Sequence, residues 1–199
     1  MKRNNERPGP RKSVVALVVL AVVGLTALSA SAGNAHFRRG SSISCTFSQT
    51  TFANDTVTCT GTGGLAGLGN ADVKFELSGA GSATYFCKNP GTNGTEAKGQ
   101  NKVPLSIPPE SITVAASNVK NGNLAFFGPT SNTIGPDTAT AVNATGKEAG
   151  CPNDSWTTRV DSVFWTSVKV SIQQPPGTEI FACTASDPNG LTGTVLLSC

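Results

Sequence analysis

Short runs of alternating apolar and polar residues recur along the chain beyond residue 41. In such a run every second side chain lies on the same face of an extended segment, so one face is apolar and the other polar. Ile43, Phe75 and Val170 are typical apolar-face positions. The five clearest runs cover residues 42–47, 71–77, 111–117, 167–173 and 192–199. This pattern, without a helical stripe, predicts half-buried antiparallel strands.

Residues that favour turns separate these runs. Pro fixes φ, Gly allows a positive φ, and Asn or Asp mimics a turn through its side chain. The predicted turn segments are Asn54-Asp55, 61–70, Pro90-Gly91, 121–123, 135–137, 173–177 and 187–190. Because turn signals recur roughly every ten to fifteen residues, we predict an all-β chain, a single antiparallel β-sandwich of the Ig-like, Greek-key type.

The first 32 residues have the composition of a secretory signal peptide. Five basic residues precede the apolar run Val14–Leu28, and the small residues 30–32 follow it. We predict cleavage after Ala32, with Ala35 as the second choice. An uncleaved membrane anchor is the alternative, but about fifteen apolar residues are fewer than the roughly twenty that span a bilayer. The predicted product is one secreted, extracellular domain, residues 33–199, without stable membrane insertion.

The charge of this predicted product differs from that of the whole chain. The signal segment holds five of the fifteen basic residues and one of the twelve acidic residues. The remainder therefore has ten basic and eleven acidic side chains, a net charge near −1. Nucleic acids and anionic membranes are bound by basic surfaces, so neither is expected as a partner.

All six cysteines lie in the predicted exported part, which indicates three disulfides in an oxidising compartment. We predict the pairs Cys45–Cys59, Cys87–Cys151 and Cys183–Cys199. The first and third pairs flank segments that can turn back as hairpins, and the remaining pair closes a loop of 64 residues. No metal site or cofactor is predicted, because the nearest cysteines are fourteen residues apart and the only histidine is His36.

Catalytic motifs are absent from the sequence. His36 stands alone near the predicted new N-terminus, and no nucleophile elbow, metalloprotease motif or nucleotide-binding glycine loop occurs. Asp154 and Asp161 are the acids closest to tryptophans, Trp156 and Trp165. They provide the alternative hypothesis of a small secreted, carbohydrate-active hydrolase with paired carboxylates. The two tryptophans are nine residues apart, so in one strand they would point to opposite faces, one into the core and one outward.

A long polar segment follows the strand that ends at Cys87. Together with the last residues of that strand it spans Tyr85–Asn101. We predict a glycine-rich surface loop that is anchored by the disulfide of Cys87. The candidate interaction residues within it are Lys88, Asn89, Pro90, Gly91, Asn93 and Lys98. The same loop, from Lys88 to Lys98, would be the reactive segment of a protease inhibitor, which is a further alternative.

Three segments, 66–70, 87–101 and 148–176, carry a resemblance to a group of small secreted proteins. The shared features are a Cys-Asn-Pro-Gly-like loop (Cys-Lys-Asn-Pro-Gly here) followed by Gly-Gln-Asn, and a later Cys-Pro-Asn-x-x-Trp strand. Taken together they resemble uncharacterised secreted proteins of actinobacteria, from Asn34 to about Pro176. The resemblance implies an exported protein from such a host and transfers no functional residues.

These observations favour a secreted, non-enzymatic protein. We expect an extracellular or cell-wall-associated interaction or structural role, because the sequence combines a signal peptide, disulfides and repeated strand patterns with an absence of catalytic motifs. The partner class that fits is a cell-wall component or an extracellular protein or carbohydrate.

Overall fold

The computed structural model describes residues 33–91, 95–128 and 131–199. The predicted signal peptide, residues 1–32, lies outside this range. Within the described part, the secondary structure consists of β-strands and one short 3₁₀ helix, η1 (Ala116–Asn118). None of the helical structure in this part is long and apolar enough to cross a membrane. The predicted all-β, antiparallel architecture is therefore confirmed.

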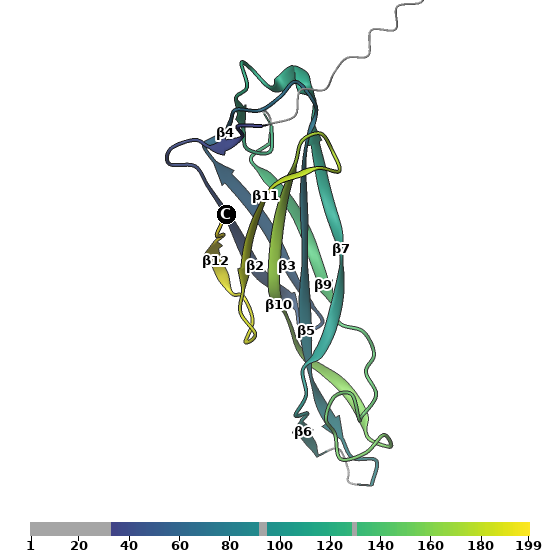
Figure 1. Ribbon diagram of the computed structural model, residues 1–199. Coiled ribbons are helices and arrows are strands. Elements are labelled where there is room, and N and C mark those ends of the chain that lie inside the picture. The colour runs from purple at the N-terminus through teal and green to yellow at the C-terminus, as the bar shows by residue number, and fades with distance from the viewer. Residues whose placement is uncertain (1–32, 92–94, 129–130) are drawn as a thin grey trace, which may run out of the picture.

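The strands form three antiparallel sheets (Figure 1). The four-stranded sheet has the order β12-β2-β3-β9, and the three-stranded sheet has the order β1-β4-β8. In the five-stranded sheet, β11 pairs with β10 and β10 with β5, while β7 and β6 follow one another along the other edge of β5. The strands are β1 (His36–Phe37), β2 (Ser42–Thr51), β3 (Asn54–Thr62), β4 (Gly64–Ala66), β5 (Val73–Lys88), β6 (Glu96–Lys98), β7 (Val103–Val114), β8 (Leu124–Ala125), β9 (Thr133–Thr140), β10 (Thr157–Gln173), β11 (Glu179–Ser186) and β12 (Gly193–Leu196).

Most of the predicted strands occur, but several boundaries differ. The run 111–117 contributes to β7 only as far as Val114, and Ala116 belongs to η1. Asn54-Asp55 is the start of β3 and not a turn; Thr51 pairs directly with Asn54. Part of the glycine-rich segment 61–70 forms β4.

The predicted turn at 135–137 lies within a strand, β9. β9 is the edge strand of its sheet, where a proline without an N–H group is tolerated. Gly135 has a φ of 103°, and the pairing of β3 with β9 shifts register between Val57 and Cys59. The proline and glycine therefore bend an edge strand without ending it.

The four- and five-stranded sheets contribute side chains to one core. Trp165 of β10 is fully buried, and its ring centre lies 6.3 Å from that of Phe47 on β2. At the other end, Phe75 of β5 contacts Phe126 and Phe127 near β8, with ring centres 6.4 and 5.0 Å apart. Because the sheets are partly curled, the Ig-like sandwich remains a prediction.

All three predicted disulfides are present. Cys45 and Cys59 are opposite residues of the β2–β3 hairpin, as expected. Cys183 and Cys199 are joined, and the chain turns back between them as expected, because Thr184 pairs with Ser198 through two backbone hydrogen bonds. β12, just before Ser198, pairs with β2 and not with β11. This bridge therefore links β11 of one sheet to the residues that follow β12 of the other.

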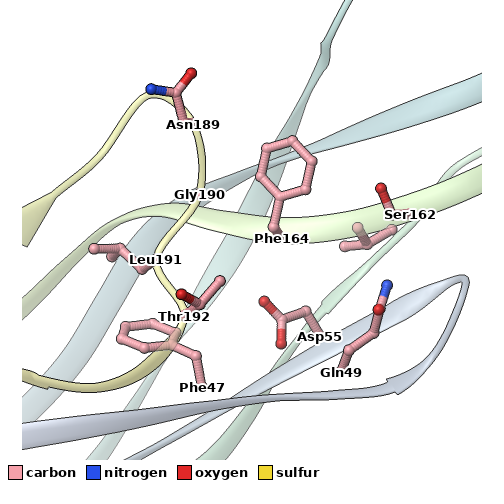
Figure 2. A pocket seen from close by; sticks show the side chains of 10 residues that line it. Phe47, Gln49, Asp55, Ser162, Phe164, Asn189, Gly190, Leu191 and Thr192 are labelled. Carbon is pink, nitrogen blue, oxygen red and sulfur yellow. The ribbon is translucent and has the colours of Figure 1, made fainter.

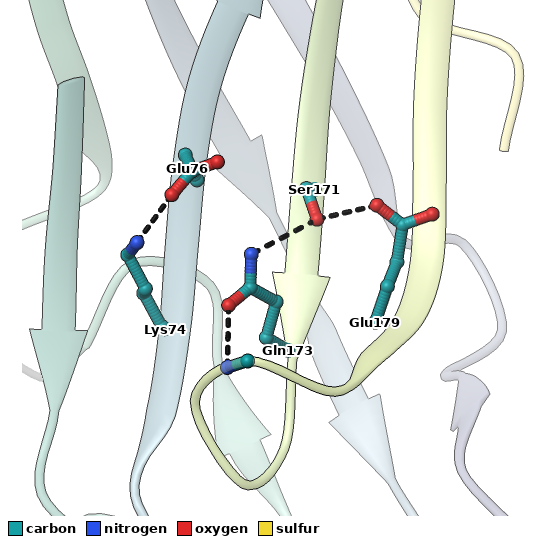
Figure 3. Close-up of polar contacts among 6 residues, drawn as sticks. Lys74, Glu76, Ser171, Gln173 and Glu179 are labelled. Carbon is teal, nitrogen blue, oxygen red and sulfur yellow. Dashed lines mark hydrogen bonds and ion pairs between the residues drawn. The ribbon is translucent and has the colours of Figure 1, made fainter. Parts of the chain in front are cut away.

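The outer face of the five-stranded sheet is polar (Figure 3). Lys74 and Glu76 form an ion pair on β5, and the Ser171 hydroxyl donates a hydrogen bond of 2.6 Å to Glu179. Lys169 Nζ lies 2.7 Å from the same Glu179 carboxylate. Hydrogen bonds from Lys169 and then Ser171 lower the pKa of Glu179. The ion pairs on this face are partly exposed, so they contribute little to the free energy of unfolding compared with the core.

Candidate functional site

β5 and β10 are the longest strands, with 16 and 17 residues, and together they extend beyond the four-stranded sheet. Their far ends, with β6, form a narrow projection at the bottom of Figure 1. We call this projection the tip and define it as residues 84–88, 96–101 and 141–161. In its three-stranded part Phe86 is opposite Lys98 on β6 and Arg159 on β10.

The inner side of the tip is closed by the segment that precedes β10. Cys87 is bonded to Cys151, and the buried Tyr85 hydroxyl donates a hydrogen bond of 2.5 Å to the Val142 carbonyl. The Thr158 hydroxyl donates to the Ala144 carbonyl at 2.7 Å. Burial is the main reason that the pKa of Tyr85 is raised, so its hydroxyl stays a donor over the physiological range. These contacts fasten the segment across the strands.

The outer side of the tip has charged side chains arranged around Phe86. The Arg159 guanidinium lies over its ring, 4.7 Å from the centre, and Lys98 Nζ lies 5.8 Å from it. Arg159 donates two hydrogen bonds to Glu96, of 2.7 and 3.3 Å. The hydrogen bond from Arg159 is the main cause of the lowered pKa of Glu96. Because Arg159 makes two hydrogen bonds to Glu96 and its guanidinium lies over the Phe86 ring, its side chain is held in one orientation.

The predicted interaction residues fall at the end of this projection. Lys88 is exposed at the end of β5, and the side-chain oxygen of Asn89 accepts a hydrogen bond of 2.9 Å from the Gly91 N–H. This bond forms an Asn turn over Pro90. Asn93 lies outside the described residues. Lys98 belongs to the short strand β6 and not to a loop.

A pocket of about 270 Å³ lies on the tip beside β6. Its lining includes Trp156, Lys98, Gln100, Pro152 and the Cys87–Cys151 disulfide. Two backbone hydrogen bonds hold its rim, from Gly99 N to Tyr85 O at 2.7 Å and from Asn101 N to Ala149 O at 3.2 Å. An aromatic surface beside an amine and an amide can bind a polar ligand with one apolar face.

The two tryptophans differ in environment as the sequence predicts. Trp165 is in the core, whereas Trp156 is half-buried and lines the tip pocket. β10 begins only at Thr157, so Trp156 precedes the strand. Its position on the tip, and not strand alternation, accounts for its exposure.

The acids proposed for hydrolysis are held by different groups. Asp154 accepts a hydrogen bond of 2.8 Å from the Lys147 N–H, which stabilises a turn. Asp161 accepts one of 3.2 Å from the Thr84 hydroxyl and lies 3.4 Å from Lys98 Nζ. His36 lies opposite Ala66 in the β1–β4 pair, and its Nδ1 is 2.9 Å from the carbonyl oxygen of Asn34, two residues earlier. Each of these side chains thus has a local structural partner.

Sequence reasoning missed one unusual acid, Asp55. The residue is 4% exposed, and its carboxylate accepts a hydrogen bond of 3.2 Å from the Trp165 N–H. Burial is the main cause of its raised pKa. The alternation of Asp55, Val57 and Cys59 would have placed it on the core face, had it not been assigned to a turn.

The tip combines exposure, a disulfide, a fixed arginine and a pocket beside a tryptophan, and it contains two of the six predicted interaction residues, Lys88 and Lys98. In the described part of the chain, no group of three or more His, Cys, Asp or Glu side chains is placed to bind a metal ion. Comparison with known protein families, curated proteins and solved structures finds no match to this chain.

Proposed function

We propose that the protein is secreted and acts outside the cell as a non-enzymatic binding protein that holds its partner with the tip. The observation that carries this proposal is the charged outer surface around Phe86, placed on the end of the longest strand pair. The body would be an Ig-like sandwich that serves as a scaffold. Three disulfides are consistent with an extracellular location.

The chemistry of the tip favours a polar or anionic partner. Lys88, Lys98 and Arg159 contribute three positive charges to the outer surface, against the carboxylates of Glu96 and Asp161. Trp156 adds an aromatic face in the neighbouring pocket. Cell-wall polymers and extracellular proteins or carbohydrates offer such groups, so we propose a partner of this kind. Arg159 is already ordered by Glu96, which reduces the entropy lost on binding.

Binding of residues 33–199 to purified cell-wall material, at several salt concentrations, tests this proposal. Lys98→Ala is expected to raise the Kd about five- to tenfold, because an amine beside the pocket is lost. Trp156→Ala should weaken binding by a similar factor. Lys120→Ala is the matched control, since this exposed lysine lies between η1 and β8, and β8 pairs with β4, which is at the opposite end from β6 in Figure 1. Equal binding by Lys98→Ala and the control would contradict the proposal, as would a protein found only in the cytoplasm.

The non-enzymatic part of the proposal rests on the local contacts of the candidate acids. Asp154 caps a turn, and Asp161 is paired with a lysine and a threonine. If purified protein hydrolyses a wall polysaccharide and Asp154→Ala or Asp161→Ala abolishes turnover, the hydrolase hypothesis replaces this one.

A further inference from the structure

A second pocket, of about 320 Å³, is shown in Figure 2, and it shares no lining residue with the tip pocket. It lies where β10, the end of β2 and the connection between β11 and β12 come together. Phe47, Phe164 and Leu191 supply apolar walls. The polar lining consists of Asp55, Gln49, Ser162, Asn189 and Thr192. Among the described residues that line it, Asp55 is the only ionisable one.

The strand beside this pocket has an open edge. β11 pairs only with Ser167–Gln173 of β10, and the β11–β12 connection then reaches Trp165 through a hydrogen bond of 2.7 Å from Leu191 N. Within the described chain, no strand pairs with residues 157–164 of β10 on the side away from β5. This edge is therefore available for main-chain hydrogen bonds.

The backbone of Val163 faces this open side. Trp165 lies opposite Gly81 of β5, but its backbone groups do not bond to that strand. Its N–H donates to the Asp55 carboxylate and its carbonyl accepts from the Leu191 N–H, so both groups point away from β5. Alternate residues of a strand direct these groups to the same side, and no bulge separates Val163 from Trp165. The N–H and C=O of Val163 thus lie on the open edge, and Val163 itself lines the pocket.

Asp55 supplies a negative charge at the same place. Its Oδ2 accepts a hydrogen bond from the Trp165 backbone N–H, and its backbone carbonyl accepts one of 3.2 Å from the Trp165 indole Nε1–H. These two bonds hold Asp55 in position. A carboxylate has about four acceptor positions, so further hydrogen bonds can be made. Lys102 contacts the Phe164 ring but donates to the Pro188 carbonyl and does not line the pocket. Among the described residues no cationic side chain pairs with Asp55, and a buried carboxylate in this state favours a positively charged ligand group.

We propose that an extended peptide segment adds as a strand to the open edge of β10 at Val163 and places a lysine or arginine side chain in the pocket against Asp55. Main-chain hydrogen bonds would supply affinity, and the pocket would supply selectivity for a basic residue. Because side chains alternate along a strand, one basic residue between two apolar ones on the same face matches the carboxylate and its apolar walls. This site is independent of the proposed function of the tip.

The test uses a seven-residue probe, acetylated and amidated, of sequence Thr-Val-Thr-Lys-Thr-Val-Thr. Its dissociation constant for residues 33–199 is measured by calorimetry and compared with that of probes carrying norleucine or glutamate in place of lysine. We expect the lysine probe to bind at least about tenfold more tightly than either. Equal binding of the lysine and norleucine probes overturns the proposal, and so does the absence of binding by all three.

Strand addition is tested separately by N-methylation of the probe. Methyl groups on the odd or on the even residues block one edge of the peptide each, so one of the two versions should lose binding. If both versions bind like the parent, or if N-acetyl-lysine amide binds as tightly as the peptide, the strand-addition proposal is wrong. A dimer of the free protein that the probe cannot dissociate would also overturn it, because a second copy would then occupy the edge.

Variants of the protein locate the site. Asp55→Asn keeps an acceptor for the Trp165 N–H and should abolish the preference for lysine over norleucine. Glu110→Gln, an exposed acid on β7, is the matched control and should retain it. Lys98→Ala, at the tip, should leave probe binding unchanged. Failure of this proposal is therefore distinguishable from failure of the tip proposal.

Discussion

Removal of the Cys87–Cys151 disulfide is expected to destabilise the protein more than removal of the Cys183–Cys199 disulfide. The first bridge closes a loop of 64 residues and the second a loop of 16. A disulfide limits the conformations of the unfolded chain, and this effect grows with the logarithm of loop length. In the chain-entropy model the two contributions are about 4 and about 3 kcal/mol at room temperature.

The native contacts around Cys87 increase the expected effect. Cys87 is 1% and Cys151 9% exposed, and the bridge fastens the segment that accepts hydrogen bonds from Tyr85 and Thr158. Without it, the segment is held by these hydrogen bonds and by those that Asn101 donates to the carbonyls of residues 147–149. We therefore expect amides of residues 144–151 to exchange with solvent faster even where the body remains folded.

Urea unfolding of the two double alanine variants, measured under identical conditions, checks this reasoning. Circular dichroism gives the midpoint and the slope, and hydrogen exchange reports on the tip. The Cys87→Ala/Cys151→Ala variant should lose about 1 kcal/mol more than the Cys183→Ala/Cys199→Ala variant. A smaller loss for the longer loop, with unchanged exchange at the tip, would refute the argument.

Three further predictions concern the core. Trp165→Ala should lower the free energy of unfolding by about 3–5 kcal/mol, measured by urea titration, because a fully buried ring is lost; a loss below 1 kcal/mol would contradict this packing. Gly79→Ala should lower the melting temperature, whereas Gly33→Ala should not, because a Cβ at Gly79 would lie 2.2 Å from the Ser167 carbonyl oxygen and nothing lies within 4 Å of one at Gly33; equal melting temperatures would contradict it. Since burial raises the pKa of Asp55 above 3.8, the native state binds this proton more tightly than the unfolded chain, so stability should decline as the pH rises through the raised pKa. Asp55→Asn should remove that decline in unfolding experiments across this pH range, and an identical pH profile in both proteins would count against it.

Local patterns predicted the covalent framework and most strands. Cys45 and Cys59 flank a segment of hairpin length, and removal of the two local pairs left Cys87 and Cys151 as partners. The pair Cys183–Cys199 is also right, and Thr184 lies beside Ser198 as a turn between the cysteines predicts, but β12 pairs with β2 and not with β11. Leu191 is buried, and its N–H donates to the Trp165 carbonyl. These contacts hold the β11–β12 connection where the chain passes from the five-stranded to the four-stranded sheet. Such a crossing depends on tertiary packing, which alternation does not encode.

The tip and the body pocket show a different limit. Lys98 belongs to β6 because residues 96–98 pair with an edge of β5 that is otherwise open there. A strand of three residues is too short to show a periodic pattern in the sequence. Asp55 looked like a turn residue beside Asn54, yet its side chain caps the Trp165 N–H on another strand. The position of Asp55 depends on a partner 110 residues away in another sheet, which its sequence neighbours could not predict. β6 pairs with nearby residues 86–88 of β5, but it is too short for its pattern to be recognised.

The three disulfides also determine what a protease could release. A cut between two bonded cysteines leaves both fragments covalently joined, and the bonded pairs are 14, 64 and 16 residues apart. More than half of the peptide bonds between Gly33 and Cys199 lie within these intervals. The exposed turn at Pro90-Gly91 is one of the protected places, because it lies between Cys87 and Cys151. After a single cut there, the two parts of the chain stay covalently joined by the Cys87–Cys151 bond until that bond is reduced.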